Sequence, residues 1–201
     1  MREFLRDLPR RIGYGPGPKL MSELRKRWVL FRHPHADIRF DGPVYLGPGF
    51  SPHIPTAGTF HVGPGVEFRR GFRAEIAADG RVRIGAGTVF TYEVVIQCST
   101  SIDIGERVMF AQGALVVDGN HRFRDLEAPT IAQGYDFRPI RIGDDAAIMS
   151  KCTVIADVGE RTFVGANSVV TKDLPPYVAA AGVPARIVDE LRGPAEQGDV
   201  G

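Results

Sequence analysis

Large apolar residues recur at every sixth position over much of this chain, with small or polar residues between them. An amphipathic helix would space such residues three and four apart, and a half-buried strand would alternate them every two. A hexapeptide repeat fits instead, because three short strands joined by tight turns form one coil of a parallel β-helix, with large aliphatic side chains inside. The repeat comprises Ile84, Phe90, Ile96 and Ile102, then Ile104, Phe110 and Val116, then Ile142, Ile148 and Val154, and finally Val158, Val164 and Val170.

Glycine directly follows several of these apolar residues, where it suits a turn whose backbone torsions a Cβ would hinder. An ordinary β-sandwich is the alternative, but its turns recur only every ~8 to 12 residues. We therefore expect an all-β chain whose first coils, around Val44, Leu46, Val62 and Phe68, are less regular than the rest. The pairs in question are Ile84-Gly85, Ile104-Gly105, Ile142-Gly143, Val158-Gly159 and Val164-Gly165.

The pattern predicts three parts. Residues 1–36 form an N-terminal basic cap or arm, residues 37–178 form the β-helix, and residues 179–201 form a short C-terminal helix and a disordered tail. The second boundary follows from Pro175 and Pro176, which end the strand rhythm. The segment VPARIVDELRG is then interpreted as the helix, and PAEQGDVG as the tail.

Composition agrees with one loop-rich domain that has a buried core, since the 201 residues are 43% hydrophobic and include 24 glycines and 15 prolines. No apolar stretch approaches the ~18 residues of a membrane span, and MREFLRDLPRR lacks the apolar centre of a signal peptide, so we expect a cytoplasmic protein. Cys98 and Cys152 are too few for a disulfide framework and lack zinc-site spacing. Cys152 is expected in the core.

Charge is distributed unevenly along the chain. Residues 1–32 hold nine Lys and Arg against three Asp and Glu, so the net charge of +1 combines a basic N-terminal part with an acidic remainder. The helix-like stretch PKLMSELRKRWVLF either caps the exposed edge of the β-helix or lies on an anionic membrane surface. Nucleic acid is not an expected partner, because no recognised binding motif accompanies the short basic run.

The longest break in the repeat lies at about residues 117–140 and predicts a protruding loop. An insertion of this length in a compact domain usually has a function. It begins with His121, flanked by Asp118 and Asn120. An imidazole, whose ordinary pKa is about 6.5, can serve as a general base at neutral pH, and an adjacent carboxylate or amide can orient its ring. A solvated loop histidine is the alternative.

Three segments together resemble the hexapeptide-repeat acyltransferases, in the branch of the maltose, galactoside and polysaccharide O-acetyltransferases. They are DGNHRFRD, IRIGDDAAIMSKCTVI and VGERTFVGANSVVTKDLPPYVAAAGVPARIV. The resemblance implies a left-handed parallel β-helix of hexapeptide repeats, a homotrimer with active sites between subunits, and acetyl-CoA as the acyl donor. The reaction that the resemblance implies requires no metal.

The resemblance also assigns roles to residues. His121 would take the proton from an acceptor hydroxyl, which then attacks the thioester directly, without an acyl-enzyme. Cofactor-binding positions along the groove would be Ser150 beside the pantetheine arm, Ala166 one coil further, and Thr171, Lys172 and Arg186 at the nucleotide end. Where sugar acetyltransferases carry asparagines near the acceptor, this chain has Thr91 and Glu93. Glu93 either orients His121 of a neighbouring subunit or is a solvated turn carboxylate.

The acceptor is expected to be a saccharide or a saccharide-containing molecule. Two other functions remain as alternatives. One is a non-catalytic trimeric scaffold or nucleotide-sugar sensor, and the other is a zinc carbonic anhydrase on the same β-helix. The latter needs three histidine ligands, whereas a single histidine, His121, follows residue 61.

Overall fold

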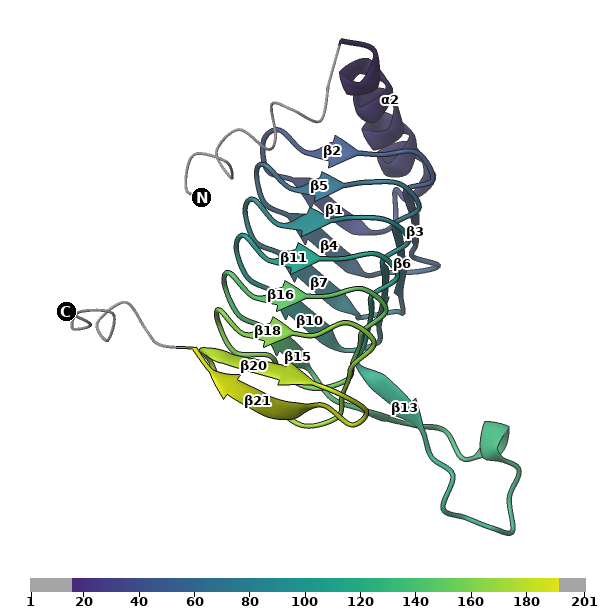
Figure 1. Cartoon of the computed structure of the whole chain (residues 1–201). Coiled ribbons are helices and arrows are strands. Elements are labelled where there is room, and N and C mark those ends of the chain that lie inside the picture. Colours follow the sequence, from purple (N-terminus) through teal and green to yellow (C-terminus); the bar gives the residue numbers. More distant parts are fainter. Residues whose placement is uncertain (1–15, 192–201) are drawn as a thin grey trace, which may run out of the picture.

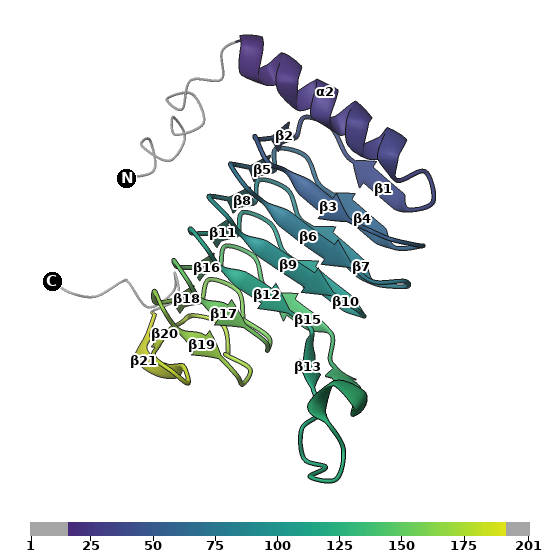
Figure 2. The ribbon, with the colours of Figure 1, turned by 90° about the vertical axis from the view of Figure 1, so that its right-hand side faces the viewer.

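Residues 16–191 of the computed structural model form a stack of coils. The stack has three walls of mainly parallel strands, a helix at one end and a hairpin that projects from one side (Figures 1 and 2). The wall called sheet A here contains, in spatial order, β1 (Asp37–Phe40), β4 (Thr59–Val62), β7 (Arg81–Ile84), β10 (Ser101–Ile104) and β15 (Ile140–Ile142). Sheet B contains β2 (Tyr45–Leu46), β5 (Glu67–Phe68), β8 (Val89–Phe90), β11 (Met109–Phe110), β16 (Ala147–Ile148), β18 (Phe163–Val164), β20 (Val178–Ala181) and β21 (Arg186–Glu190). Sheet C contains β3 (Ser51–His53), β6 (Arg73–Ile76), β9 (Val95–Cys98), β12 (Leu115–Val117), β17 (Thr153–Val154) and β19 (Val169–Val170).

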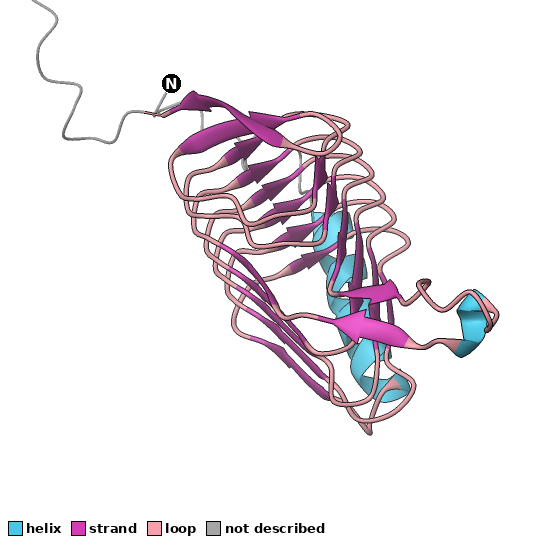
Figure 3. Cartoon of the chain, turned by 90° about the horizontal axis from the view of Figure 1, so that it is seen from below, coloured by secondary structure: helices cyan, strands magenta, loops and turns pink. Residues whose placement is uncertain are grey.

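The predicted β-helix is therefore confirmed, and its walls are seen end-on in Figure 3. Each coil contributes inward side chains from its walls to a common core, and most of them are large and apolar. In sheet B the rings of Phe68, Phe90 and Phe110 stack nearly parallel, with centroids 4.9 and 4.7 Å apart. The first coils are as well packed as the later ones, because Val44, Leu46, Val62 and Phe68 are all buried.

Two corners of every coil use left-handed backbone. At the corner between sheets A and B the residues with positive φ are Gly42, Gly65, Gly87, Arg107, Asp145, Arg161 and Tyr177. At the corner between sheets B and C they are Gly49, Gly71, Glu93, Gly113, Lys151 and Asn167. Glu93 thus occupies a turn position that glycine fills in neighbouring coils, with φ of 57°.

The glycines that follow the apolar residues have a different role from the one we expected. Gly85, Gly105 and Gly143 do not have left-handed torsions. They are small because coils approach closely there: a Cβ on Gly85 would lie 2.5 Å from the carbonyl carbon of Gly105 in the next coil. The missing side chain therefore permits stacking of coils, and other residues make the sharp turn.

Helix α2 (Pro16–Arg32) covers the open edge of sheet B at β2. The Leu46 backbone N–H donates to Ser22 Oγ at 2.8 Å, and Ser22 Oγ–H donates to the Val44 carbonyl at 3.3 Å. Arg25 donates to the Leu46 carbonyl at 2.9 Å, and Val29, on the same helix, is buried. These contacts favour the cap over the free arm, because they satisfy backbone groups that an edge strand leaves open.

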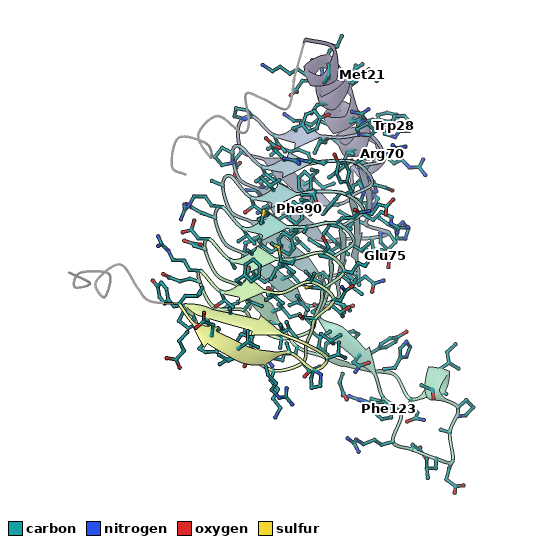
Figure 4. All side chains as sticks on the ribbon, viewed as in Figure 1. Met21, Trp28, Arg70, Glu75, Phe90 and Phe123 are labelled. Atoms are coloured by element: carbon teal, nitrogen blue, oxygen red, sulfur yellow. The ribbon has the colours of Figure 1, made fainter. Side chains whose placement is uncertain are left out.

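The outward side of α2 carries Leu20, Leu24, Trp28 and Phe31, which are all exposed. Trp28 points away from the coils in Figure 4. Among residues 16–191, no helix is long and apolar enough to cross a membrane. The remaining predictions for residues 1–15 and for the tail after residue 191 lie outside the described part of the chain.

The predicted C-terminal helix is wrong. Residues 186–190 form β21, which pairs antiparallel with β20, so that Ala181 lies opposite Arg186 and Val178 opposite Glu190. The physical reason is that β20 ends the parallel stack and would expose its backbone groups. The β-branched residues Ile187 and Val188 also suit a strand. A hairpin therefore closes this end of the molecule, as the helix closes the other.

Replacing Ser22 with alanine should lower the free energy of unfolding by about 1 to 3 kcal/mol, because the buried Leu46 N–H loses its acceptor. Urea denaturation at one protein concentration measures the change. The matched control is Glu23→Ala on the exposed side of α2, which should shift stability by less than about 0.5 kcal/mol. Equal stability of the Ser22 variant and the unaltered protein would show that α2 does not cap the stack.

Candidate active site

The predicted loop is a β-hairpin that leaves the stack at the corner between sheets C and A. Strand β13 (Gly119–His121) pairs antiparallel with β14 (Tyr135–Phe137), and the short 3-10 helix η1 (Thr130–Ala132) lies near the tip. His121 is therefore directly opposite Tyr135, and their ring centroids are 4.2 Å apart. Hydrogen bonding within the hairpin places His121 just outside the coil. We call the base of the hairpin, residues 118–121 and 135–138, its neck.

The neck is tied to the coil before it by Asp118, which is buried. Its carboxylate accepts hydrogen bonds from the Ser99 N–H at 2.8 Å, the Thr100 N–H at 2.6 Å and the Thr100 hydroxyl at 2.8 Å. The Asp118 carbonyl accepts from the Arg138 N–H at 2.8 Å, which closes the neck. Asp118 therefore anchors the backbone from which His121 projects.

A second set of contacts ties the neck to the coils that follow. The Arg138 guanidinium lies 2.5 Å from Asp173 and 3.6 Å from Asp157. The Asp157 backbone N–H and then Arg138 lower the pKa of the Asp173 carboxyl, so it stays ionised at neutral pH. The neck is thus held from both sides.

The orienting roles expected for Asp118 and Asn120 are not seen within one chain. Among the described residues, no hydrogen bond joins either side chain to the His121 ring, and Tyr135 is the ring that packs against it. The side chain of Asn120 is exposed. The Glu93 side chain lies at the other edge of sheet C, in the turn before β9.

His121 borders two pockets. The first, of about 460 Å³, lies against the outer face of sheet C, and its wall includes His53, Glu75, Gln97, Tyr135 and Phe137. The second, of about 650 Å³, lies on the tip side of the hairpin and includes Arg122, Arg124, Asp125 and Asp136. A base in this position can meet one reactant on each side.

Sequence reasoning missed the polar row in the first pocket. His53 aligns with Glu75 in the next coil, and Glu75 aligns with Gln97 in the coil after that. The spacing of these residues in the sequence could have revealed the row, because residues one coil apart become neighbours. Glu75 and Gln97 are 22 residues apart in sequence. The coil stack thereby brings His53 into the pocket that also contains His121.

Neither cysteine has the character of a nucleophile. Burial, and then the negative charge of Asp118, raise the pKa of the Cys98 thiol to about 12. Burial also raises the pKa of Cys152, whose Sγ lies 3.0 Å from the Gly165 carbonyl. The core position expected for Cys152 is confirmed, and both thiols stay protonated at neutral pH.

The expected cofactor-binding residues occupy two edges of sheet C. Ser150 and Ala166 are at the corner between sheets B and C on successive coils, where the Asn167 N–H donates to the Ser150 carbonyl at 2.9 Å. Arg186 follows at the same corner, opposite Ala181. Thr171 and Lys172 come after β19 and lie at the other edge of the sheet. One chain therefore groups Ser150, Ala166 and Arg186, but separates them from His121 by the width of sheet C.

No group of three or more His, Cys, Asp or Glu that could hold a metal ion is found in residues 16–191.

Asp118→Ala should lower the free energy of unfolding by about 2 to 4 kcal/mol, because it leaves the Ser99 and Thr100 N–H groups without an acceptor. Hydrogen exchange at Ser99 and Thr100 should accelerate in the same variant. Asp136→Ala, on the exposed side of the same hairpin, is the control and should cost less than about 1 kcal/mol. Unchanged exchange at both amides would contradict the anchoring role.

Comparison with known proteins bears on what this arrangement does. No protein-family model matches the chain. A probable acetyltransferase of Mycobacterium tuberculosis is 32% identical over 173 residues, which are 82% of this chain and 56% of that protein. Galactoside O-acetyltransferase of Escherichia coli is 34% identical over 113 residues, which are 55% of this chain and 54% of that protein. The chain spans about half the length of these two curated relatives.

A solved structure is similar to this chain in fold. A hexapeptide-repeat acetyltransferase of Vibrio cholerae, crystallised with acetyl-coenzyme A, has a TM-score of 0.59 and is 24% identical, covering 85% of this chain and 79% of that one. This likeness concerns the fold, and the fold class expected from the sequence is confirmed. The chain is therefore similar in sequence to acetyltransferases and similar in fold to a hexapeptide-repeat acetyltransferase.

Proposed function

We propose that this protein is an acetyl-CoA-dependent O-acetyltransferase that acts on a hydroxyl of a saccharide, with His121 as the general base. The observation that carries the proposal is the position of His121, on an anchored neck between two pockets. Two reactants must meet at the base in a direct transfer, and this position is accessible from both sides. The similarity to galactoside O-acetyltransferase supports a saccharide acceptor.

The chemistry follows from one proton transfer. His121 takes the proton from the acceptor hydroxyl as its oxygen attacks the thioester carbonyl of acetyl-CoA. The tetrahedral intermediate collapses, the carbon–sulfur bond breaks, and the departing thiolate receives the proton from the imidazolium. A backbone N–H near the coil after the hairpin would stabilise the oxyanion. No acyl-enzyme is required, in agreement with the buried, protonated state of Cys98 and Cys152.

The separation of His121 from the expected donor groove supports a shared site. Ser150, Ala166 and Arg186 lie across the width of sheet C from His121 in the same chain. We therefore propose a homotrimer in which the hairpin of one subunit reaches the groove of its neighbour. Glu93 lies at the same corner as Ser150, so in such an assembly it would face the neighbour's His121.

We also propose where the protein is located in the cell. A cytoplasmic protein is expected from the sequence, and peripheral contact with the inner face of the membrane would use the outward side of α2. Its exposed Leu20, Leu24, Trp28 and Phe31, together with the cations Lys19 and Arg27, have the composition of an interfacial helix. A non-catalytic scaffold or sensor is the alternative function, and it would not need a base between two pockets.

His121→Ala should lower kcat by about 100- to 10,000-fold, because the acceptor hydroxyl loses its general base. Thiol release with acetyl-CoA and a sugar acceptor measures turnover. His35→Ala, which removes a histidine outside the two pockets, is the control and should retain normal kcat. Acetyl-CoA at 100 times its Kd should stabilise the unaltered protein and the His121 variant alike, by about 2.7 kcal/mol. Normal turnover by the His121 variant would refute its role as the base.

The shared site is tested by mixing two inactive variants. Co-expressed His121→Ala and Ala166→Trp subunits, the latter with an obstructed groove, should regain activity in roughly a quarter of the sites if subunits mix at random. Each variant alone should be inactive, and mixing the folded proteins without subunit exchange should restore nothing. Mixed trimers that remain inactive would show that His121 and the groove of one chain act together.

A further inference from the structure

The pocket on the outer face of sheet C has a chemistry that separates it from the pocket on the tip side. Its wall includes Glu75 and Asp118 as carboxylates, together with two histidines, and no lysine or arginine is among the described residues that line it. The pocket on the tip side includes Arg122 and Arg124. The phosphates of coenzyme A need cationic partners, and the proposed donor groove has Arg186 whereas the described lining of the sheet C pocket has no lysine or arginine, so the sheet C pocket is the poorer place for the donor.

The row His53, Glu75 and Gln97 provides polar groups at regular intervals along the stack. Adjacent strands are separated by about 4.8 Å, so the three strands that carry the row, β3, β6 and β9, extend over roughly 10 Å. The row begins in the coil next to the one that carries the hairpin and continues toward the helix-capped end. In Figure 4, Glu75 lies on the side from which the hairpin projects. The row is longer than a single pyranose ring.

The row offers complementary hydrogen-bonding groups. Gln97 Nε2 donates to one Glu75 oxygen at 2.8 Å, which fixes both side chains while leaving acceptor oxygens on each. Glu75 is exposed and therefore accessible to a ligand. A carboxylate next to an amide can accept hydrogen bonds from neighbouring hydroxyl groups, and repels a ligand that carries its own negative charge.

The hairpin contributes an aromatic part of the pocket wall. Tyr135 and Phe137 stack with centroids 5.5 Å apart and an interplanar angle of 13°, and 47% and 48% of their surfaces are exposed. Flat, half-exposed rings provide an apolar surface against which the C–H face of a sugar ring can pack. The pocket therefore combines an aromatic wall with a polar row, and His121 lies at its end.

We propose that this pocket binds the acceptor as an extended, uncharged or amine-bearing saccharide of more than one ring, and that Glu75 excludes anionic sugars. The inference rests on the proposed acetyl transfer and adds the class of acceptor and the residue that selects it. One ring is presented to His121 while the next ring lies along Gln97 and Glu75. Uronic and sialic acids are excluded by repulsion from the Glu75 carboxylate.

The experiment compares kcat/KM for three acceptors at saturating acetyl-CoA: a methyl glycoside, a neutral disaccharide and the corresponding disaccharide with one uronic acid. The unaltered protein should favour the neutral disaccharide over each of the others by about tenfold or more. Glu75→Gln, which keeps the shape but removes the charge, should raise kcat/KM for the acidic disaccharide about tenfold. It should also raise KM for the neutral disaccharide severalfold without changing kcat.

Two further variants complete the test. Gln97→Ala should raise KM for the disaccharide but not for the methyl glycoside, because it removes a contact to the second ring. Asp103→Asn, which alters a half-buried carboxylate on sheet A, is the matched control and should leave all three values unchanged. If turnover occurs and Glu75→Gln affects neutral and acidic acceptors equally, or neither, the selection by Glu75 is overturned while acetyl transfer stands. Failure of every acceptor, with no stabilisation by acetyl-CoA, would overturn both.

Discussion

Backbone hydrogen bonding between consecutive coils is the constraint on which the rest of this structure depends. Each inner strand of the stack pairs in parallel register with the strand one coil earlier and the strand one coil later. A side chain that points inward must therefore fit directly on the side chain of the next coil, as the rings of Phe68, Phe90 and Phe110 do. The same pairing has no natural end, so each end of the stack exposes backbone donors and acceptors. Helix α2 satisfies the groups at one end with the side chains of Ser22 and Arg25, and strand β21 satisfies those at the other end with its own backbone.

The sequence predicts the walls well because the period of six reports inward side chains directly. It fails at the C-terminal end of the stack, where the structure is decided by a partner strand rather than by local preference. Residues 186–190 read as a short helix, but the open edge of β20 recruits them as a strand. Glycine was also misinterpreted in part. Its position after the apolar residue marks the close approach of coils at Gly85 and Gly143, whereas sharp turns are made by glycine and also by Glu93 and Lys151.

The candidate site was predictable to the extent that it interrupts the repeat. The position of His121 at the start of the insertion could be read from the sequence, as could the core position of Cys152. The role of Asp118 could not, because its partners Ser99 and Thr100 belong to the previous coil. The row from His53 to Gln97 was missed for the same reason. Residues one coil apart become neighbours, and recognising them requires the coil length as well as the period within a coil.

The stack also explains how a long insertion can carry His121, the proposed base, without disturbing the core. Strand β12 ends in sheet C and β15 begins in sheet A, so the chain leaves and returns at one corner. The neck is fixed to earlier coils through Asp118 and to later coils through Arg138 and Asp173. Since both attachments lie outside the hairpin tip, the tip can change in length or sequence while His121 keeps its place. This separation makes the tip and the outer row of sheet C the parts of the proposed site where acceptor preference can vary, and it leaves the position of His121 to the rigid coils.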